Sequence, residues 1–251
     1  MPDETTTIRI AAAGDVHCHD GNRDHVRAAF AALDDVDLVL LAGDLTTHGE
    51  PEQAAILAEA CHSVQAPVVA VLGNHDWHVN RAGELTALLQ EAGITVLDRG
   101  AWTCALGGVE VGVVGAKGFV GGFPGSRLPD FGEPLLRELY AETTREVEAL
   151  GRGLKEIAHC QVRIVLLHYA PIVETLAGEP EGIWSMLGTD RLAPPIAEHE
   201  PDMVLHGHAH AGSFEGAIGP VPVYNVSVPV MARDFWVFEL SGLERAVAPL
   251  R

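Results

Sequence analysis

The side chains best suited to chemistry in this 251-residue sequence are aspartate, asparagine and histidine residues that follow short apolar runs. They occur in five motifs, which in chain order are Asp15-Val16-His17, Gly43-Asp44, Gly73-Asn74-His75-Asp76, His168 and Gly207-His208-Ala209-His210. Carboxylate, amide and imidazole groups are ligands for hard and borderline divalent metals. Two such ions side by side can stabilise both the attacking and the leaving oxygen of a phosphoryl transfer. The residue types therefore predict a dinuclear metal site.

The elements that must position these motifs alternate between strand and helix along the chain. Short apolar runs predict strands, and apolar positions three or four residues apart predict helices. The predicted strands are Ile8–Ala13, Val36–Leu41, Val68–Leu72, Thr95–Leu97, Ala101–Leu106, Val109–Gly115, Val162–Leu167, Met203–Leu205, Val221–Val226 and Phe235–Leu240. The predicted helices are Asp24–Leu33, Pro51–Val64, Glu84–Ala92, Pro134–Ile157 and Arg191–His199.

This order predicts an α/β fold in which the first strands form a mainly parallel sheet with helices outside. The later strands, which are joined by short turns, predict a second sheet of more mixed direction. No linker rich in proline, glycine and serine divides the chain, so we expect one domain over residues 1–251. In the longest predicted helix, Gly151 and Gly153 should each weaken the helix by about 1 kcal/mol relative to alanine.

Several motif residues lie at the carboxyl ends of predicted strands, where ligand sites of open α/β sheets collect. Asp44 follows the second predicted strand and Asn74 follows the third. In extended backbone, residues i and i+2 point to the same side. We therefore expect two pairs of side chains to converge, Asp15 with His17 and His208 with His210.

The composition favours a small substrate over a polynucleotide or a membrane. The net charge is −19 and only two lysines occur, so the surface repels nucleic acid and anionic lipid. No apolar run reaches the roughly 20 residues that span a bilayer. Residues 1–7 lack a signal-peptide pattern, and the four cysteines form no C-x-x-C pair; both features favour a cytoplasmic protein with reduced thiols. Cys18, beside His17, is better explained as a buried neighbour than as a ligand.

The ordered set D-x-H, G-D, G-N-H-D, H and G-H-x-H resembles the calcineurin-like metallophosphoesterase superfamily, from Asp15 to His210. The resemblance implies a four-layer α/β/β/α sandwich, with two mixed β-sheets flanked by helices, and a dinuclear centre. It assigns Asp15, His17 and His210 to one ion, Asn74, His168 and His208 to the other, and Asp44 to both. This ligand set suits Mn, Fe, Zn, Co or Ni.

The chemistry that the resemblance implies is hydrolysis of a phosphate ester by a hydroxide held between two divalent ions. His75 is the candidate general acid for the leaving oxygen; the alternative is that it only binds phosphate. Many relatives have an aspartate three residues after the shared one, where this sequence has Thr47. Asp76 is the candidate replacement that orients His75, and the alternative is a ring that is less firmly held. His19 is a further candidate contact to phosphate, and His206 a candidate support for the last motif.

The Asp-Leu pair after Gly43 and the compact length are most similar to the class III cyclic-nucleotide phosphodiesterase branch. The predicted function is therefore a phosphodiesterase that hydrolyses small, nucleotide-like diesters. Two alternatives stay open, a phosphomonoesterase of the same fold and a non-catalytic metal-binding scaffold. Candidate substrate contacts between the motifs are Lys117, Phe119, Phe123, Arg127, Tyr169, Trp184 and Met186. An aromatic ring among them could stack on a base. The more ordinary interpretation of Lys117 is a surface lysine, and the alternative for Trp184 is an anchor of the long connection from Tyr169 to Pro195.

Overall fold

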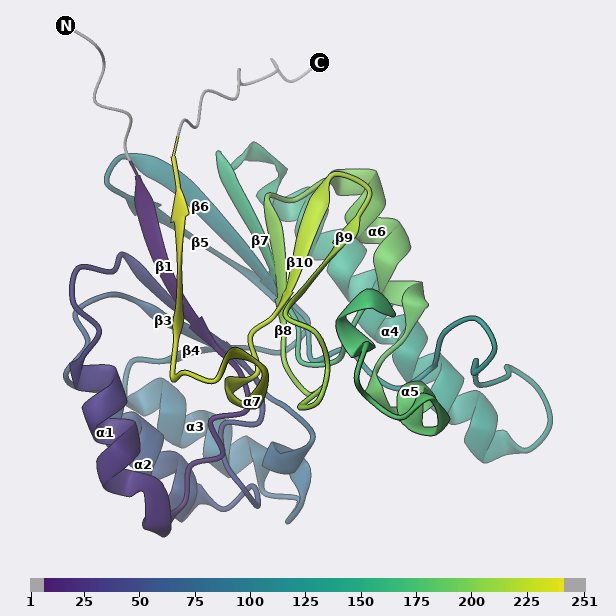
Figure 1. Cartoon of the computed structure of the whole chain (residues 1–251), viewed down its shortest axis with the longest axis horizontal. Helices are drawn as coiled ribbons and strands as arrows, with labels where there is room; N and C mark the ends of the chain where they lie inside the picture. Colours follow the sequence, from purple (N-terminus) through teal and green to yellow (C-terminus); the bar gives the residue numbers. More distant parts are fainter. Residues whose placement is uncertain (1–6, 242–251) are drawn as a thin grey trace, which may run out of the picture.

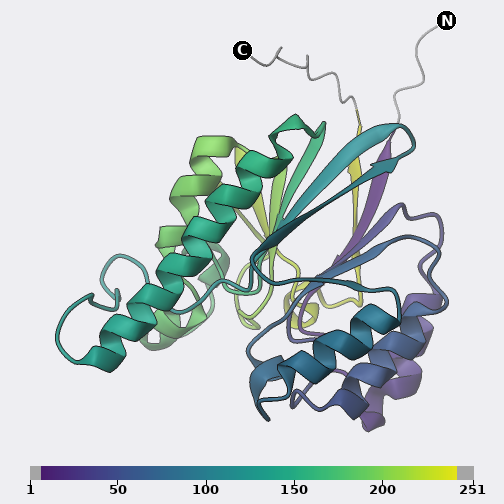
Figure 2. The same cartoon turned by 180° about the vertical axis from the view of Figure 1, so that it is seen from behind.

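The computed structural model describes residues 7–241, which form two β-sheets with helices on their outer faces (Figure 1). The view from behind shows the same two layers of strands between two sets of helices (Figure 2). The predicted α/β class with two mixed sheets is therefore confirmed. Residues 1–6, most of the stretch without a signal-peptide pattern, lie outside the described residues. Within residues 7–241, no helix is both long and apolar enough to cross a bilayer.

The first sheet has four parallel strands and one antiparallel edge strand. Its order is β11 (Trp236–Leu240), β1 (Ile8–Ala13), β2 (Leu38–Ala42), β3 (Val68–Val71) and β4 (Thr95–Leu97). The helices of this half are α1 (Arg23–Ala31), α2 (Pro51–Cys61) and α3 (Ala82–Glu91). They lie together on the outer side of the sheet (Figure 1). Every residue of β2 and β3 is buried, as expected for strands covered on both faces.

The final strand corrects the sequence prediction, which grouped it with the later strands of the second sheet. Instead β11 pairs antiparallel with β1, with Ile10 opposite Phe238. The chain returns to the first sheet through the short helix α7 (Val228–Met231), which the sequence did not predict. A strand's own pattern reports which of its faces is buried and does not specify a distant partner, so this pairing was not readable locally.

The second sheet has four parallel central strands and an antiparallel strand at each edge. Its order is β5 (Gly100–Leu106), β6 (Val109–Gly115), β7 (Val162–Leu166), β8 (Met203–His206), β10 (Val221–Asn225) and β9 (Glu215–Ile218). The long helix α4 (Pro134–Glu156) and α6 (Ala193–His199) cover its outer face (Figure 2). The short elements β9 and α5 (Trp184–Leu187) were not predicted, because four residues are too few to show a period. Single 3-10 turns occur at Asp20–Asn22, His75–Trp77, Ile157–His159, Glu174–Leu176, Glu181–Ile183 and Asp190–Leu192.

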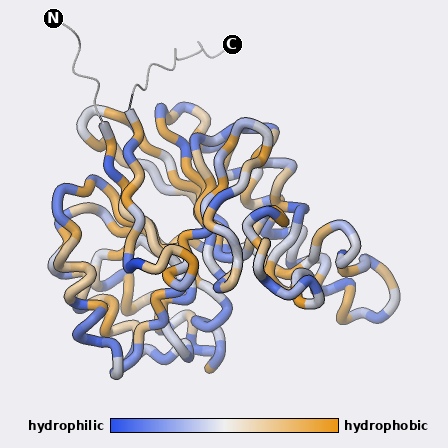
Figure 3. Tube along the Cα trace, viewed as in Figure 1, coloured by the Kyte–Doolittle hydropathy of each residue, from blue (hydrophilic) through white to orange (hydrophobic). Residues whose placement is uncertain are grey.

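The main hydrophobic core lies between the two sheets. It joins fully buried side chains of the first sheet, such as Leu40 and Val69, to Val113, Ile164 and Leu205 of the second. A second buried cluster lies under α4 and α6. The coloured trace of Figure 3 shows apolar residues along the strands and polar residues on the outer helices and loops. This packing brings the ends of parallel strands from both sheets to one edge of the molecule.

Hydrogen bonds join the two sheets at this edge. The backbone N–H of Gly14, after β1, donates to the carbonyl oxygen of Val226, after β10, at 2.7 Å. The ring of His168, after β7, contacts the carbonyl oxygen of Ala42 at the end of β2, at 2.9 Å. The motif-bearing loops of both halves therefore meet.

The two glycines of α4 provide a matched test of this packing. A methyl group at Gly153 would lie 2.5 Å from Cγ1 of Val114 in β6, whereas at Gly151 the nearest atom is 3.7 Å away, on Pro195. Gly151→Ala should raise the free energy of unfolding by up to about 1 kcal/mol, because alanine favours the helix. Gly153→Ala should lower it by about 1–3 kcal/mol, because the helix must move off the sheet. Chemical denaturation measures both values, and equal signs for the two variants would contradict this packing.

Candidate metal centre

Two groups of metal-competent side chains meet at the edge where the sheets join. One group contains Asp15, His17, Asp44 and His210, and the other contains Asp44, His168 and His208. Within each group, the candidate ligand atoms lie within 4.8 Å of one another. The amide oxygen of Asn74 lies beside the second group, 2.9 Å from Nε2 of His168. The structure thus brings together all seven residues that the sequence singled out, and Asp44 is the one shared by both groups.

The backbone that presents these residues is left-handed at several of them. Asp15 has φ +60°, His17 +47°, Asp44 +49° and His208 +70°. The expectation that Asp15 and His17 converge from extended backbone is therefore wrong, and the same holds for the last motif. Tight left-handed turns after β1 and β8 aim the side chains instead. Aspartate and histidine populate this region more often than most residues, but each instance still costs roughly 1–3 kcal/mol.

Glycines precede the candidate ligands because neighbouring ligands occupy the space that a side chain would need. A methyl group at Gly73 would lie 2.1 Å from Oδ1 of Asp44. A methyl group at Gly207 would lie 2.4 Å from Oδ2 of Asp15. The glycines of the motifs are therefore part of the cradle that closes the two groups around a common point.

Two buried carboxylates dominate the electrostatics of the centre. Asp15 and Asp44 expose only 3% and 1% of their surface. Burial and then the negative charge of Asp15 raise the pKa of Asp44 to about 7. Burial also opposes ionisation of Asp15, but the hydrogen bond from His210 and the nearby imidazoles outweigh it and hold its pKa at about 2. Two acids placed this close favour a bound positive charge.

Three imidazoles, those of His17, His168 and His208, leave lone pairs without hydrogen-bond donors, which is what a metal ion requires. Nε2 of His17 is buried, has no hydrogen-bond partner among the described residues, and lies 3.7 Å from Oδ2 of Asp44. Burial lowers the pKa of His17 and of His168 to about 4, so both rings are neutral at pH 7. A neutral ring carries one N–H. His168 nevertheless faces oxygen acceptors with both nitrogens, Ala42 O at Nδ1 and Asp44 Oδ1 at Nε2, 3.3 Å away.

A cation at Nε2 of His168 resolves this conflict between acceptors, so the donor set fits divalent metal. His208 is arranged in the same way with its nitrogens exchanged. Its Nε2 donates to the carbonyl oxygen of Met186 at 3.1 Å, which leaves the lone pair on Nδ1. Burial lowers the pKa of His208 to about 3. Protons therefore do not compete for these nitrogens at neutral pH.

His206, the candidate support of the last motif, is fully buried. Its Nδ1 contacts the carbonyl oxygen of Gly207 at 2.8 Å and its Nε2 contacts the hydroxyl of Thr175 at 2.8 Å. It therefore fixes the turn that presents His208.

His19 is exposed, and its ring contacts the main-chain oxygen of His17 at 3.0 Å. Cys18 is a buried neighbour, as expected, and burial raises the pKa of its thiol well above the usual range.

His75 lies at the rim of the centre, with Nε2 3.9 Å from Oδ2 of Asp44. Its Nδ1 donates to the carbonyl oxygen of Thr47 at 2.8 Å. The expectation that Asp76 orients this ring is corrected, since the main chain of Thr47 does so. The alternative of a loosely held ring is also not what the structure shows.

Asp76 has a different task, which the sequence analysis missed. Its fully buried carboxylate accepts hydrogen bonds from the backbone of Leu45 and Thr46, the Thr46 hydroxyl and the backbone of Gly73. These donors lie on the loops after β2 and β3. Asp76 therefore clamps the loop of Asp44 to the loop of Asn74. No sequence signal separates such a clamp from an acid that points into the site.

Only some of the candidate substrate contacts line a pocket beside the centre; the others lie in the core or on the surface. Lys117 is not a surface lysine, because its ammonium lies 4.4 Å from the ring centre of Phe119 and 5.1 Å from that of Tyr169. These three residues border a pocket of about 550 Å³ that also reaches Asn74. Phe123 is buried and Arg127 pairs with Asp190. The indole of Trp184 donates to Glu179 O at 3.3 Å, so it anchors the connection, and Met186 is 55% exposed.

Comparison with known families agrees with this centre. Residues 8–212 match the family model described as calcineurin-like phosphoesterase. The chain belongs to the calcineurin-like phosphoesterase family. The match covers most of the chain and contains every motif residue, so the superfamily resemblance read from the sequence is confirmed. Members of this family are phosphoester hydrolases that use divalent metals, and the two groups of this chain provide candidate binding sites for them.

Solved structures show the same fold at low sequence identity. The phosphopantetheinyl hydrolase of Mycobacterium tuberculosis is 17% identical, with a TM-score of 0.65 over 88% of this chain and 89% of its own. The protein TT1561 of Thermus thermophilus is 18% identical, with a TM-score of 0.56 over 93% of this chain and 99% of its own. No curated protein sequence matches the chain. At these identities the likeness concerns the fold alone.

The contact between Gly73 and Asp44 gives a direct test of the cradle. Gly73→Ala should lower both metal content and phosphoesterase turnover, the latter by about 100-fold, because a displacement near 1 Å is enough to disrupt a catalytic arrangement. Gly182→Ala is the matched control, since a methyl group there meets nothing within 4 Å. Elemental analysis of the purified proteins and ester hydrolysis measure the two effects. Unchanged metal content and turnover in Gly73→Ala would show that the cradle is looser than described.

Proposed function

We propose that this chain is a phosphodiesterase that hydrolyses small, nucleotide-like diesters with two divalent metal ions. The observation that supports the proposal most is the position of Asp44, which belongs to both groups of candidate ligands. A single site would not need two convergent sets of lone pairs around one carboxylate. Asp15, His17 and His210 hold the first ion in this proposal, and Asn74, His168 and His208 hold the second.

With two divalent ions bound, the centre would supply a deprotonated water as nucleophile at neutral pH and would neutralise charge on the phosphoryl oxygens. The remaining tasks fall to the chain itself. Oδ1 of Asp44 accepts the backbone N–H of His75 at 2.8 Å, which fixes the shared carboxylate relative to that ring. Metal identity among Mn, Fe, Zn, Co and Ni follows availability, because the ligand types accept all five.

His75 is the general acid of the proposal. Because its Nδ1 donates to the carbonyl of Thr47, the nitrogen that faces the centre is Nε2. In the neutral ring Nε2 carries the lone pair, so proton donation requires the charged imidazolium. Thr47 O then plays the part of a positioning group, since it holds the ring with Nε2 toward Asp44. The proton passes from Nε2 to the oxygen of the departing alcohol.

A diester is favoured over a monoester by the charges around the centre. A phosphate monoester carries a second negative charge, which an additional cation in the site would stabilise. Among the described residues, two cationic side chains line the pocket beside the centre, and both are engaged within the protein. Arg99 forms ion pairs with Glu142 and Glu146. The ammonium of Lys117 donates to the carbonyl oxygen of Gly118 and lies over the ring of Phe119. The net charge of −19 argues equally against polynucleotides and anionic membranes as partners. Hydrolysis of monoesters is the alternative that the same centre would support.

A non-catalytic scaffold is the alternative of another class. Such a protein would be expected to have lost one or more ligands, whereas all seven positions of this chain retain metal-competent side chains. We also assign the protein to the cytoplasm, since its four cysteines are free thiols.

Metal dependence and ester preference test the proposal together. With Mn²⁺ the protein should hydrolyse bis-p-nitrophenyl phosphate faster than p-nitrophenyl phosphate, and chelation should abolish both activities. Asp44→Asn should lose more than about 100-fold in turnover and release metal, because both ions lose a shared anionic ligand. Faster monoester hydrolysis would support the phosphomonoesterase, and no metal-dependent turnover with either ester would support the scaffold.

The role of His75 predicts a dependence on the leaving group. His75→Ala should lower kcat about 100-fold or more for an alkyl phosphodiester, whose alkoxide needs a proton. For a p-nitrophenyl diester the loss should be within about tenfold, because nitrophenolate departs without one. Steady-state kinetics on the two substrates measure the difference. Equal losses would assign His75 to phosphate binding instead of proton donation.

A further inference from the structure

A groove begins beside the candidate metal centre and continues along α3. Its first part is the pocket of about 550 Å³ to which Asn74 and Tyr169 contribute. Its second part is a pocket of about 490 Å³ between α3 and β4. The two parts share Trp77, Asp98 and Lys117, so they form one continuous depression. A ligand whose phosphate lies at the centre can therefore extend into the second part without leaving the protein.

The wall shared by the two parts contains one exposed aromatic ring, that of Trp77. Trp77 belongs to the 3-10 turn that starts at His75, yet 46% of its surface is exposed. Across the first part, the rings of Phe119 and Tyr169 lie 6.0 Å apart, edge to face. An exposed indole face next to a reaction centre can stack on a flat ring, which contributes roughly 1–3 kcal/mol for a nucleobase.

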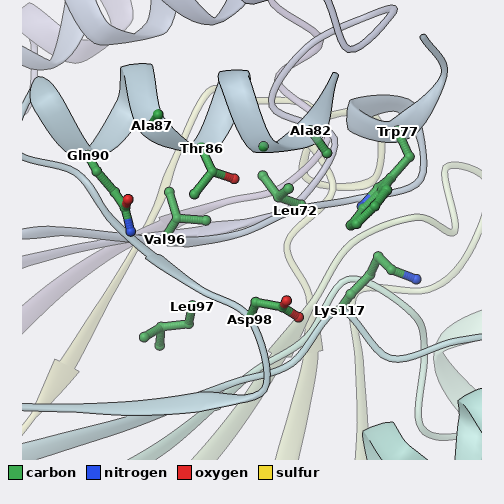
Figure 4. Close-up of a pocket in the computed structure, with 11 residues that line it drawn as sticks. Leu72, Trp77, Ala82, Thr86, Ala87, Gln90, Val96, Leu97, Asp98 and Lys117 are labelled. Atoms are coloured by element: carbon green, nitrogen blue, oxygen red, sulfur yellow. The ribbon is translucent and has the colours of Figure 1, made fainter. Parts of the chain in front are cut away.

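The second part of the groove carries polar side chains that can form hydrogen bonds with a flat ring stacked on Trp77. Thr86 and Gln90 point from α3 toward Val96, while Trp77 and Lys117 stand at the other end (Figure 4). The side chains of Thr86 and Gln90 make no hydrogen bond within residues 7–241, and Asp98 adds a carboxylate acceptor. From Ala82 to Gln90 the helix rises by roughly 12 Å. This length and the volumes are those of a small-molecule site.

We propose that this groove binds the organic group of the substrate as a nucleobase, stacked on Trp77 with its polar edge toward Thr86 and Asp98. The inference deepens the proposed function and rests on it, because it puts the scissile phosphate beside Asn74. Trp77 and Thr86 then determine specificity and take no part in the chemistry. An extended aliphatic group would use the apolar floor of the groove and would gain nothing from the indole face.

The test compares nucleotide and sugar phosphate binding to the Mn²⁺-loaded full chain by isothermal titration calorimetry. Adenosine 5′-monophosphate should bind at least about tenfold more tightly than ribose 5-phosphate, which has the same phosphate and no base. Trp77→Leu should remove this preference while leaving the affinity for ribose 5-phosphate within about twofold, and Trp77→Phe should restore part of it. Thr86→Val should weaken the binding of adenosine 5′-monophosphate and leave the affinity for ribose 5-phosphate unchanged, because it removes a hydroxyl that faces the base.

Phe131→Leu is the matched control, because Phe131 is 72% exposed and does not line the groove. It should bind both probes as the unmodified protein does. Equal affinities for the two probes in the unmodified protein, or an undiminished preference in Trp77→Leu, would overturn the proposal. If the Trp77→Leu protein fails to fold, the comparison of the two probes on the unmodified protein and the Thr86→Val variant decide.

Failure of this inference is distinguishable from failure of the proposed function. Metal-dependent turnover of bis-p-nitrophenyl phosphate without any preference for the base would remove the groove assignment and retain the phosphodiesterase. A base preference that depends on Trp77, found together with an absence of turnover, would retain the groove and remove the enzyme.

Discussion

Two buried carboxylates, set among imidazoles of which His17, His168 and His208 are kept neutral by burial, are the constraint on which the rest of this structure depends. Asp15 and Asp44 are almost without solvent contact, and Asp15 raises the pKa of its neighbour. Backbone donors compensate part of the charge, as at His208 N, which lies 2.9 Å from Oδ2 of Asp15. The lone pairs that remain point inward. An arrangement of this kind is costly unless cations share it, so the same features that destabilise the empty centre favour binding of metal.

The packing of the two sheets offsets the free-energy cost of holding these groups together. Parallel strands of two sheets end at one edge, and the core between the sheets fixes their distance. At that edge, four candidate ligands adopt left-handed backbone. Glycines leave the space that neighbouring ligands occupy, and Asp76 links two loops by hydrogen bonds. The site is thus locally destabilising and the buried strands supply the compensating stability, which is the usual division in functional proteins.

The sequence predicted the parts of this arrangement that depend on local pattern and on residue type. Apolar runs located ten of the eleven strands within residues 7–241, and the types of side chain after them identified the seven residues of the candidate centre. What it missed depends on distant main chain. The pairing of β11 with β1, the support of His75 by the carbonyl of Thr47 and the clamp by Asp76 involve partners 28 or more residues away. The convergence of Asp15 with His17 was predicted from the wrong backbone, because spacing alone does not distinguish an extended pair from a left-handed turn.

The central claim is that two cations share Asp44, and anomalous scattering tests it most directly. Diffraction from Mn²⁺-soaked crystals at the manganese edge should show two peaks, roughly 3.5–4 Å apart. One peak should lie among Asp15, His17 and His210 and the other among Asn74, His168 and His208, with the Asp44 carboxylate between them. A single peak, or a pair of peaks without Asp44 between them, would contradict the account.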